Sequence, residues 1–275
     1  MKELIEQKEL VNDLDWKYLI VLDACRFDHF KEYCSFDGSL KKVRSPAFEG
    51  EGAPTSVWYR NVFRNRYEDI VHISSHPRVN SMMEVEGFKG AEHFSRVIDL
   101  WDSGWDERYG TVLPETVTEE GLKTIKKYPK KKFIFHYMQP HTPYLSLDPP
   151  STKKKREPGS RTSFKRKARN LVVKNTRRFI GDKNAVDLMS WLGLPPLSPM
   201  DDALRKVGED GVRKAYKENL VRALRSVEDL LDQLEGKVVI TSDHGELLGE
   251  RGRFGHDFKG FEELEMVPWF ELEED

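Results

Sequence analysis

Side chains that could bind a metal ion follow several short apolar runs of this sequence. They are carboxylates and imidazoles, namely Asp23, His136, His141, Asp243, His244 and His256. Carboxylate oxygens and imidazole nitrogens together bind divalent cations such as zinc and manganese. The sequence therefore predicts a cation site with mixed oxygen and nitrogen ligands, built from residues that are far apart in the chain.

The apolar runs themselves predict the elements that would bring these side chains together. Runs rich in Val, Ile and Phe cover residues 18–22, 70–73, 133–135 and 238–240. Such runs are typical of strands buried on both faces of a parallel sheet. Ligands bind at the carboxyl ends of the strands in an open parallel sheet. We therefore expect Asp23, His136 and Asp243 to meet at one edge.

A strong helix precedes the last of these runs. Apolar residues recur at steps of three and four from Tyr216 to Leu234, and Gly236 then provides a helix stop. Helices that alternate with buried strands predict an α/β fold. We expect a mostly parallel central sheet with helices on both faces.

The separate motifs differ in how much they indicate. A single Asp at a strand end often caps a helix, and a His beside Pro often packs in a core. The tract Ser242-Asp243-His244-Gly245-Glu246 is stronger. Two adjacent ligand-type residues that leave a buried strand are costly unless they are paired or coordinated. The joint pattern favours a metal site.

Length and composition limit the class of protein. The chain has 275 residues, 38% hydrophobic content and a formal net charge of −2, which excludes a globally basic nucleic-acid binder. We expect one domain over residues 1–275 and no membrane span, because no apolar run approaches the roughly 20 residues that a span requires. The N-terminus lacks a secretory pattern, and the chain has only two cysteines, Cys25 and Cys34. A cytoplasmic location is expected.

One basic stretch interrupts the α/β pattern between residues 151 and 199. It is rich in Lys and Arg, poor in acids, and bordered by proline pairs at Pro149-Pro150 and Pro195-Pro196. We interpret it as an insertion or lid, either mobile or helical, that could cover an anionic substrate. A solvated charged loop without a function is the alternative.

Four sequence motifs together resemble those of the alkaline phosphatase/sulfatase superfamily, and in particular its short archaeal sulfatase-like branch. The motifs are Val-Leu-Asp-Ala-Cys-Arg-Phe-Asp at 21–28, Gln-Pro-His-Thr-Pro-Tyr at 139–144, Ser-Asp-His-Gly-Glu at 242–246 and Gly-His at 255–256. The resemblance runs from about Lys17 to Phe270, outside residues 151–199. It implies an alkaline-phosphatase-like fold and an enzyme that acts on phosphoric or sulfuric esters with a metal.

The resemblance also implies a metal-bound nucleophile after the first strand. The matching segment is Gly52-Ala53-Pro54-Thr55-Ser56-Val57-Trp58, where Thr55 is the first choice and Ser56 the reserve. Metal coordination would activate such a hydroxyl. Alternatively, Pro54-Thr55-Ser56 caps a helix that begins near Val57. Both roles can hold together, because a helix N-terminus also favours an anionic group.

Some residues depart from the pattern of the family. Neither Cys25 nor Cys34 lies in the C/S-x-P-x-R motif that sulfatases convert to formylglycine, and Ala24 replaces a second acid. These departures argue against a true sulfatase and favour phosphate esters. We expect one cation, and a second cation site is left open. The expected ligands of the first cation are Asp23, Thr55, Asp243 and His244, and His256 would serve the second.

The remaining polar residues receive provisional roles. His141 could bind the substrate or protonate the leaving group, and His256 could bind the substrate as well. Arg26 could pair with Asp28 or contact the ester, and the structural pairing is preferred. For His136 we expect core packing. No function is assigned to the other histidines, which are His29, His72, His76 and His93.

Together these features predict a metal-dependent hydrolase or transferase of phosphate esters with a threonine nucleophile. Its cofactor would be a divalent metal, with Zn or Mn favoured over Mg or Ca. Its partner would be an anionic ester, free or linked to a glycan or lipid. The alternatives are a sulfate-ester hydrolase and an inactive protein on the same scaffold that binds polyanions. The sequence does not indicate an oligomeric state.

Overall fold

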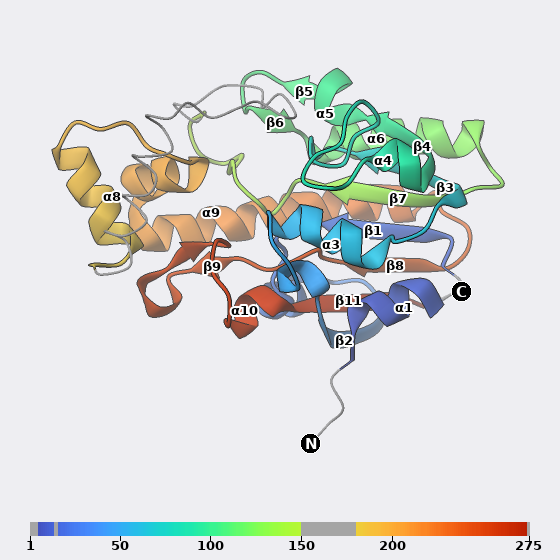
Figure 1. Cartoon of the computed structure of the whole chain (residues 1–275), viewed down its shortest axis with the longest axis horizontal. Helices are drawn as coiled ribbons and strands as arrows, with labels where there is room; N and C mark the ends of the chain where they lie inside the picture. Colours follow the sequence, from blue (N-terminus) through green and yellow to red (C-terminus); the bar gives the residue numbers. More distant parts are fainter. Residues whose placement is uncertain (1–4, 14–15, 150–179, 274–275) are drawn as a thin grey trace.

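The computed structural model describes residues 5–13, 16–149 and 180–273. Within these residues the central sheet has seven strands in the order β2-β11-β8-β1-β7-β3-β4 (Figure 1). The strands are β1 (Tyr18–Leu22), β2 (Gly38–Arg44), β3 (Tyr67–Ser74), β4 (Phe94–Asp99), β7 (Lys132–Tyr137), β8 (Val238–Thr241) and β11 (Met266–Leu272). The strands from β8 to β4 pair in parallel, whereas β11 is antiparallel to β8 and β2. The predicted, mostly parallel sheet is confirmed.

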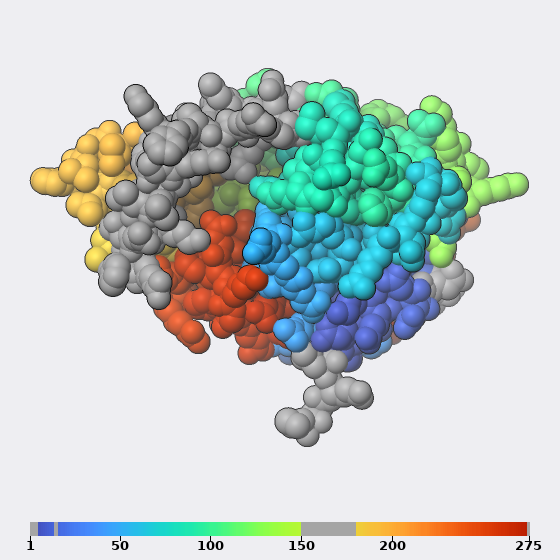
Figure 2. All heavy atoms as spheres, in the orientation of Figure 1, coloured from blue at the N-terminus to red at the C-terminus, as the bar shows by residue number. Residues whose placement is uncertain are grey.

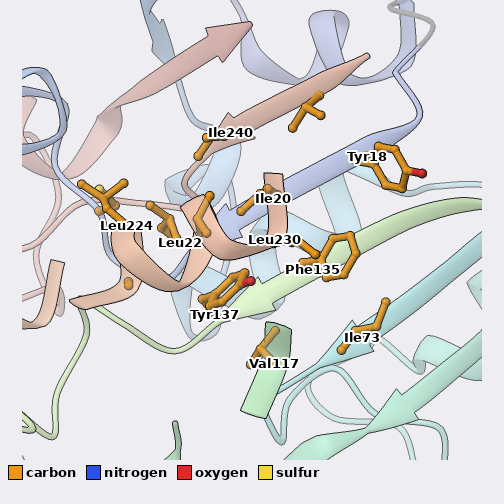
Figure 3. Close-up of a cluster of buried hydrophobic side chains, with 14 of the residues drawn as sticks. Tyr18, Ile20, Leu22, Ile73, Val117, Phe135, Tyr137, Leu224, Leu230 and Ile240 are labelled. Carbon is orange, nitrogen blue, oxygen red and sulfur yellow. The ribbon is translucent and has the colours of Figure 1, made fainter. Parts of the chain in front are cut away.

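Helices cover both faces of the sheet, as predicted. Successive side chains of a strand point to opposite faces, and β1 shows this alternation. Leu19 and Val21 pack in one core, whereas Ile20 and Leu22 pack in the other. The core that contains Leu22 includes side chains of α2, α6 and α9 (Figure 3), and the opposite core includes side chains of α1 and α3. These helices are α1 (Gln7–Asp13), α2 (Phe27–Tyr33), α3 (Pro54–Val62), α6 (Pro114–Lys127) and α9 (Pro199–Leu231).

Helix α9 is longer than the predicted apolar stripe, and it is broken at one residue. Gly208 has a φ of 67°, a left-handed conformation that glycine adopts at little cost. The part of α9 after this break packs Leu220, Leu224 and Leu230 on the sheet. The part before it packs with α8 (Asp182–Trp191) in a third core cluster. The third cluster also includes Val212 and Tyr216 after the break, so only the later part of the helix reaches the core on the sheet.

The predicted basic insertion lies only partly within the described residues. Positions 151–179 fall outside them, so the interpretation of that stretch as a lid stays a prediction. The remainder contains α8, whose Val186 and Met189 are buried beside Tyr144 and Leu248. This end of the insertion is therefore packed onto the main fold.

Shorter elements lie between the main ones along the chain. They are α4 (Gly90–His93), α5 (Leu100–Ser103), α10 (Glu262–Glu265), β5 (Trp105–Asp106), β6 (Thr111–Val112), β9 (Leu247–Leu248), β10 (Phe254–Gly255) and the 3-10 turns Pro46–Phe48 and Glu250–Gly252. Residues of the first quarter of the chain lie beside the red C-terminal segment on one face (Figure 2). In the described part of the chain, every helix is too short or too polar to span a bilayer.

Candidate metal centre

Asp23 and Asp243 are brought together by the turn that follows β1. Strand β1 lies between β7 and β8 in the middle of the sheet, and Asp23 comes directly after its last residue. The next residue, Ala24, has a φ of 60°, which is uncommon for a residue with a side chain. In this conformation the Ala24 amide donates to Asp243 Oδ1 over 3.1 Å. The tight turn thus ties the ends of β1 and β8 to each other.

The hydrogen bonds of Asp243 and His244 leave one acceptor atom on each side chain. Asp243 Oδ1 also accepts from the His244 amide at 2.9 Å, whereas Asp243 Oδ2 is buried without a hydrogen-bond partner. His244 Nδ1 lies 2.8 Å from the carbonyl oxygen of Gly245, to which it must donate. In the neutral ring, His244 Nε2 therefore carries a lone pair. It lies 3.5 Å from Asp243 Oδ2 and 3.8 Å from Asp23 Oδ1.

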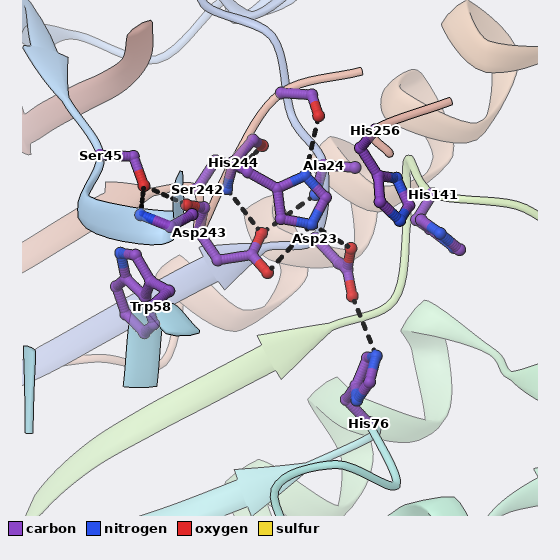
Figure 4. A network of polar contacts seen from close by, with 12 residues as sticks. Asp23, Ala24, Ser45, Trp58, His76, His141, Ser242, Asp243, His244 and His256 are labelled. Carbon is purple, nitrogen blue, oxygen red and sulfur yellow. Dashed lines mark hydrogen bonds and ion pairs between the residues drawn. The ribbon is translucent and has the colours of Figure 1, made fainter. Parts of the chain in front are cut away.

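Three electron-rich atoms consequently face one point in a fully buried place (Figure 4). Asp23, Asp243 and His244 offer ligand atoms that all lie within 4.8 Å of one another. Buried carboxylates are costly unless they are paired or coordinate a metal. The residues present fit a divalent cation, and we assign them as its candidate ligands.

The histidines around Asp23 lower the pKa of its carboxyl group. Burial alone would raise the pKa of this carboxyl group, but the surrounding imidazoles outweigh burial and lower the pKa below its usual range. The imidazoles are those of His141, His136, His76 and His244. Asp23 is therefore ionised at neutral pH, as a metal ligand must be.

Close packing around the Ser242–Glu246 tract explains why it contains a serine and a glycine. Ser242 Oγ accepts from the Cys25 amide at 2.8 Å and donates to the carbonyl oxygen of His244 at 2.5 Å. At Gly245, a Cβ atom would collide with the backbone oxygen of Glu263. The tract thus has a serine that joins two loops and a glycine that allows the backbones to touch.

A second group of ligand-type residues adjoins the first. Among the residues that the structure describes, His141, Glu246 and His256 form the other group whose ligand atoms lie within 4.8 Å of one another. The ring centroid of His256 is 4.6 Å from that of His244 and 5.1 Å from that of His141. His141 Nδ1 donates to the carbonyl oxygen of Thr142 over 2.6 Å, which leaves His141 Nε2 as an acceptor in the neutral ring.

Unlike the first group, the second is paired internally. His256 Nδ1 lies 2.9 Å from Glu246 Oε1. Burial would lower the pKa of His256, but Glu246 outweighs it and raises the pKa to about 9. Conversely, burial would raise the pKa of Glu246, and His256 reverses this and lowers it. Glu246 was not among the predicted site residues, although it lies within the Ser242–Glu246 motif.

Thr55 lies in the first turn of α3, at the carboxyl edge of the sheet. The last residue of this helix, Val62, accepts a hydrogen bond from Asn12. Asn12 comes shortly before β1, so this end of α3 lies near the amino edge of the sheet. In the middle of the helix, Tyr59 contacts His136, close to the end of β7. Residues three and four apart share a helix face, so Thr55, which is only 4% exposed, lies on the face of Trp58 and Tyr59. Trp58 is in turn linked through Gln7 to Thr241 and Ser242.

The capping interpretation of this segment is wrong. Helix α3 begins at Pro54, and its N-cap residue is Ala53, which makes no side-chain cap bond. Thr55 and Ser56 lie inside the helix and are buried. Their hydroxyls are therefore not required to start it.

Arg26 is enclosed by carboxylates in this structure. Its guanidinium group forms ion pairs with Asp28 at 2.7 Å and with Glu250 at 2.6 Å. This is the structural pairing that the sequence analysis preferred for Arg26. The predicted contact with an ester stays a prediction.

Two further histidines lie beside Asp23: His136, which was expected at this edge of the sheet, and His76, to which the sequence analysis assigned no function. His76 Nε2 and His136 Nε2 each lie 3.7 Å from Asp23 Oδ2. His136 is buried, as expected for core packing, but it also faces a candidate ligand. The only sequence signal for either residue is its position at the end of a predicted strand.

Fold and site together define a member of the alkaline phosphatase/sulfatase superfamily. The family model described as Sulfatase matches residues 61–270, which is more than half of the chain, and the protein belongs to this family. The match begins after Thr55, so Asp23 and Thr55 lie outside it. A search of curated proteins found no match. Membership of an archaeal branch stays a prediction.

Solved structures of phosphoethanolamine transferases share the fold. The C-terminal periplasmic domain of EptC from Campylobacter jejuni has a TM-score of 0.53 at 14% identity, covering 94% of this chain and 78% of that chain. For the integral membrane protein EptA from Neisseria meningitidis the TM-score is 0.52 at 14% identity, covering 92% and 47%. The zinc complex of the corresponding EcEptC domain from Escherichia coli has a TM-score of 0.50 at 12% identity, covering 94% and 72%. This chain thus spans about half the length of EptA.

Proposed function

We propose that this protein is a metal-dependent hydrolase or transferase of phosphate esters. The observation that carries the proposal is the convergence of Asp23 Oδ1, Asp243 Oδ2 and His244 Nε2 in a buried place. Membership of the Sulfatase family supports ester chemistry, and the phosphoethanolamine transferases that share the fold support a phosphate ester.

Thr55 is the proposed nucleophile, and it joins Asp23, Asp243 and His244 as a ligand. A bound zinc or manganese ion would stabilise negative charge on the ester and acidify a ligated hydroxyl. The Thr55 oxygen forms a bond to phosphorus while the bond to the leaving oxygen breaks. The Thr55 proton passes to solvent, and His256, whose pKa is raised to about 9, protonates the leaving oxygen. Water or an acceptor alcohol then displaces threonine from phosphorus.

The proposed cofactor and substrate follow from the same residues. Imidazole and carboxylate ligands favour zinc or manganese over magnesium or calcium, and a related structure was solved as a zinc complex. The substrate would be an anionic ester, free or linked to a glycan or lipid. We also propose a cytoplasmic location, which the two free thiols, Cys25 and Cys34, support.

A sulfate ester is the second candidate substrate, favoured by the family to which the chain belongs. The environment of Cys25 argues against a sulfate ester, because sulfatases convert a cysteine or serine to formylglycine. This thiol is fully buried, and burial raises its pKa well above the ordinary value. The chain also lacks the maturation motif of sulfatases, so the phosphate ester is preferred.

Substitution of the hydroxyls on α3 tests the proposal. Thr55→Ala should lower the turnover of a nitrophenyl phosphate ester by about 1,000-fold or more, because it removes the nucleophile. Ser56→Ala is the matched control and should retain activity within a few-fold. Zinc content, measured by elemental analysis, should stay near that of the unmodified protein in both variants. If both variants hydrolyse the ester at the unmodified rate, the nucleophile is not on this helix.

A further inference from the structure

Two imidazoles outside the candidate ligand groups converge on one oxygen of Asp23. His76 Nε2 and His136 Nε2 both lie 3.7 Å from Asp23 Oδ2. Their rings are nearly parallel, with centroids 5.6 Å apart. His244, in contrast, approaches Asp23 Oδ1. The two oxygens of this carboxylate therefore have different surroundings.

The proton of His76 is fixed by a backbone amide. The Arg78 N–H donates to His76 Nδ1 over 3.0 Å. Nδ1 must therefore carry the lone pair, and the proton of this ring lies on Nε2. His76 thus directs an N–H donor towards Asp23 Oδ2 (Figure 4).

The proton of His136 is fixed by a hydrogen-bonded chain. Tyr59 Oη lies 3.1 Å from His136 Nδ1 and 2.7 Å from His72 Nε2. The hydroxyl has one hydrogen, so it donates to one ring and accepts from the other. His72 Nδ1 is buried without a hydrogen-bond partner. A buried unpaired N–H is rarer than an unpaired acceptor, so the proton of His72 belongs on Nε2.

The direction of the chain follows from this assignment. His72 Nε2 donates to Tyr59 Oη, and Tyr59 donates to His136 Nδ1. The proton of His136 therefore lies on Nε2, which is buried without any other partner. Like His76, His136 directs an N–H donor towards Asp23 Oδ2.

We propose that His76 and His136 are positioning residues that hold Oδ2 of Asp23, so that Oδ1 is the atom offered to the cation. At 3.7 Å each contact is longer than a direct hydrogen bond, and it acts as the attraction between an N–H dipole and a carboxylate charge. Partners of this kind orient metal ligands in other proteins, and their loss typically weakens metal binding 10–100-fold. The inference rests on the proposed metal site.

Tyr59 also connects this arrangement to the nucleophile. It lies four residues after Thr55 on α3, on the same helix face. The hydroxyl that fixes His136 therefore also holds the turn that follows Thr55 against β7. Asp23 and Thr55 are thus positioned through one shared side chain.

Zinc affinity tests this role without any need for a substrate. Tyr59→Phe in the full chain should raise the zinc dissociation constant about 10-fold or more, measured by competition with a fluorescent chelator. Tyr137→Phe is the matched control, because Tyr137 is equally buried and its hydroxyl bonds Thr118 in the opposite core. Its zinc affinity should stay within about twofold. ¹⁵N NMR of the cation-free protein should show His76 and His136 protonated at Nε2.

A second variant keeps the test decisive if Tyr59→Phe does not fold. His76 is 9% exposed, at the margin of the site, and His76→Ala should weaken zinc binding about 10-fold. The inference is overturned if the folded variants bind zinc as the unmodified protein does, or if Tyr137→Phe weakens binding equally. In those cases the proposed function still stands. If the unmodified protein binds no zinc or manganese, both proposals fail.

Discussion

The two groups of ligand-type residues at the carboxyl edge differ in how their polar atoms are satisfied. In the group of Asp23, Asp243 and His244, neither oxygen of Asp23 has a hydrogen-bond partner, and the same holds for Asp243 Oδ2. In the group of His141, Glu246 and His256, a hydrogen bond of 2.9 Å joins the last two residues. The first group therefore has buried acceptors that a cation would compensate, whereas two members of the second group compensate each other.

This difference separates two roles that the sequence alone could not separate. A buried set of carboxylates is costly unless it is paired or coordinates a cation. A histidine and a carboxylate that pair with each other can instead bind the substrate or transfer a proton. We therefore expect the first group to be essential and the second to modulate the reaction.

The largest effect is expected in the first group. Asp243→Asn keeps the shape of the side chain but removes the charge that would compensate a cation. Activity towards a nitrophenyl phosphate ester should fall about 1,000-fold or more. Asp28→Asn is the control, because Asp28 lies outside both groups, and its activity should change less than threefold. An equal loss of activity in both variants would mean that the loss does not depend on the first group.

A smaller effect is expected in the second group. Glu246→Gln removes the carboxylate that pairs with His256, so the ring loses its fixed orientation. Turnover should fall about 10–100-fold while zinc bound by the first group is retained. Steady-state kinetics and elemental analysis of the same preparation would measure both. If Glu246→Gln removes the zinc completely, the second group is itself the main cation site.

The smallest effect on activity is expected outside both groups, at Arg26. Burial would raise the pKa of Asp28 and of Glu250, but Arg26 outweighs it and lowers both. A lowered pKa contributes stability above the unfolded value, near 4, and this contribution is lost as the pH falls through the folded value. Arg26→Met should therefore lower the free energy of unfolding by about 2 kcal/mol at pH 7.

The same variant distinguishes a structural role of Arg26 from a role in binding the ester. Urea unfolding should show that the stability difference shrinks below about pH 4, while KM stays within about threefold of the unmodified value. A large rise in KM with little loss of stability would instead assign Arg26 to the substrate.

The sequence predicted the sheet where apolar runs were continuous. Residues 18–22 and 238–240 correspond to β1 and β8 because strands buried on both faces require apolar side chains at every position. It did not predict β2, whose residues Gly38–Arg44 are largely exposed at an edge. An exposed edge strand carries polar residues such as Lys41 and Lys42, so it lacks the continuous apolar run by which the other strands were predicted.

The site was predictable where its residues share a motif. Asp243 and His244 are adjacent in the chain, and the structure brings both to Asp23. His76 could not be predicted, because its role depends on β3 and β1 meeting at the same edge. The hydrogen bonds of Tyr59 likewise join residues of a helix and two strands, and no local sequence pattern predicts such contacts.

Zinc binding to the cation-free protein tests the central claim most directly. Isothermal titration of the unmodified chain should show at least one zinc ion bound, and Asp243→Asn should weaken that binding about 100-fold or more. Asp28→Asn should leave it unchanged. If Asp243→Asn binds zinc as tightly as the unmodified protein, then Asp23, Asp243 and His244 do not share a cation, and the account is contradicted.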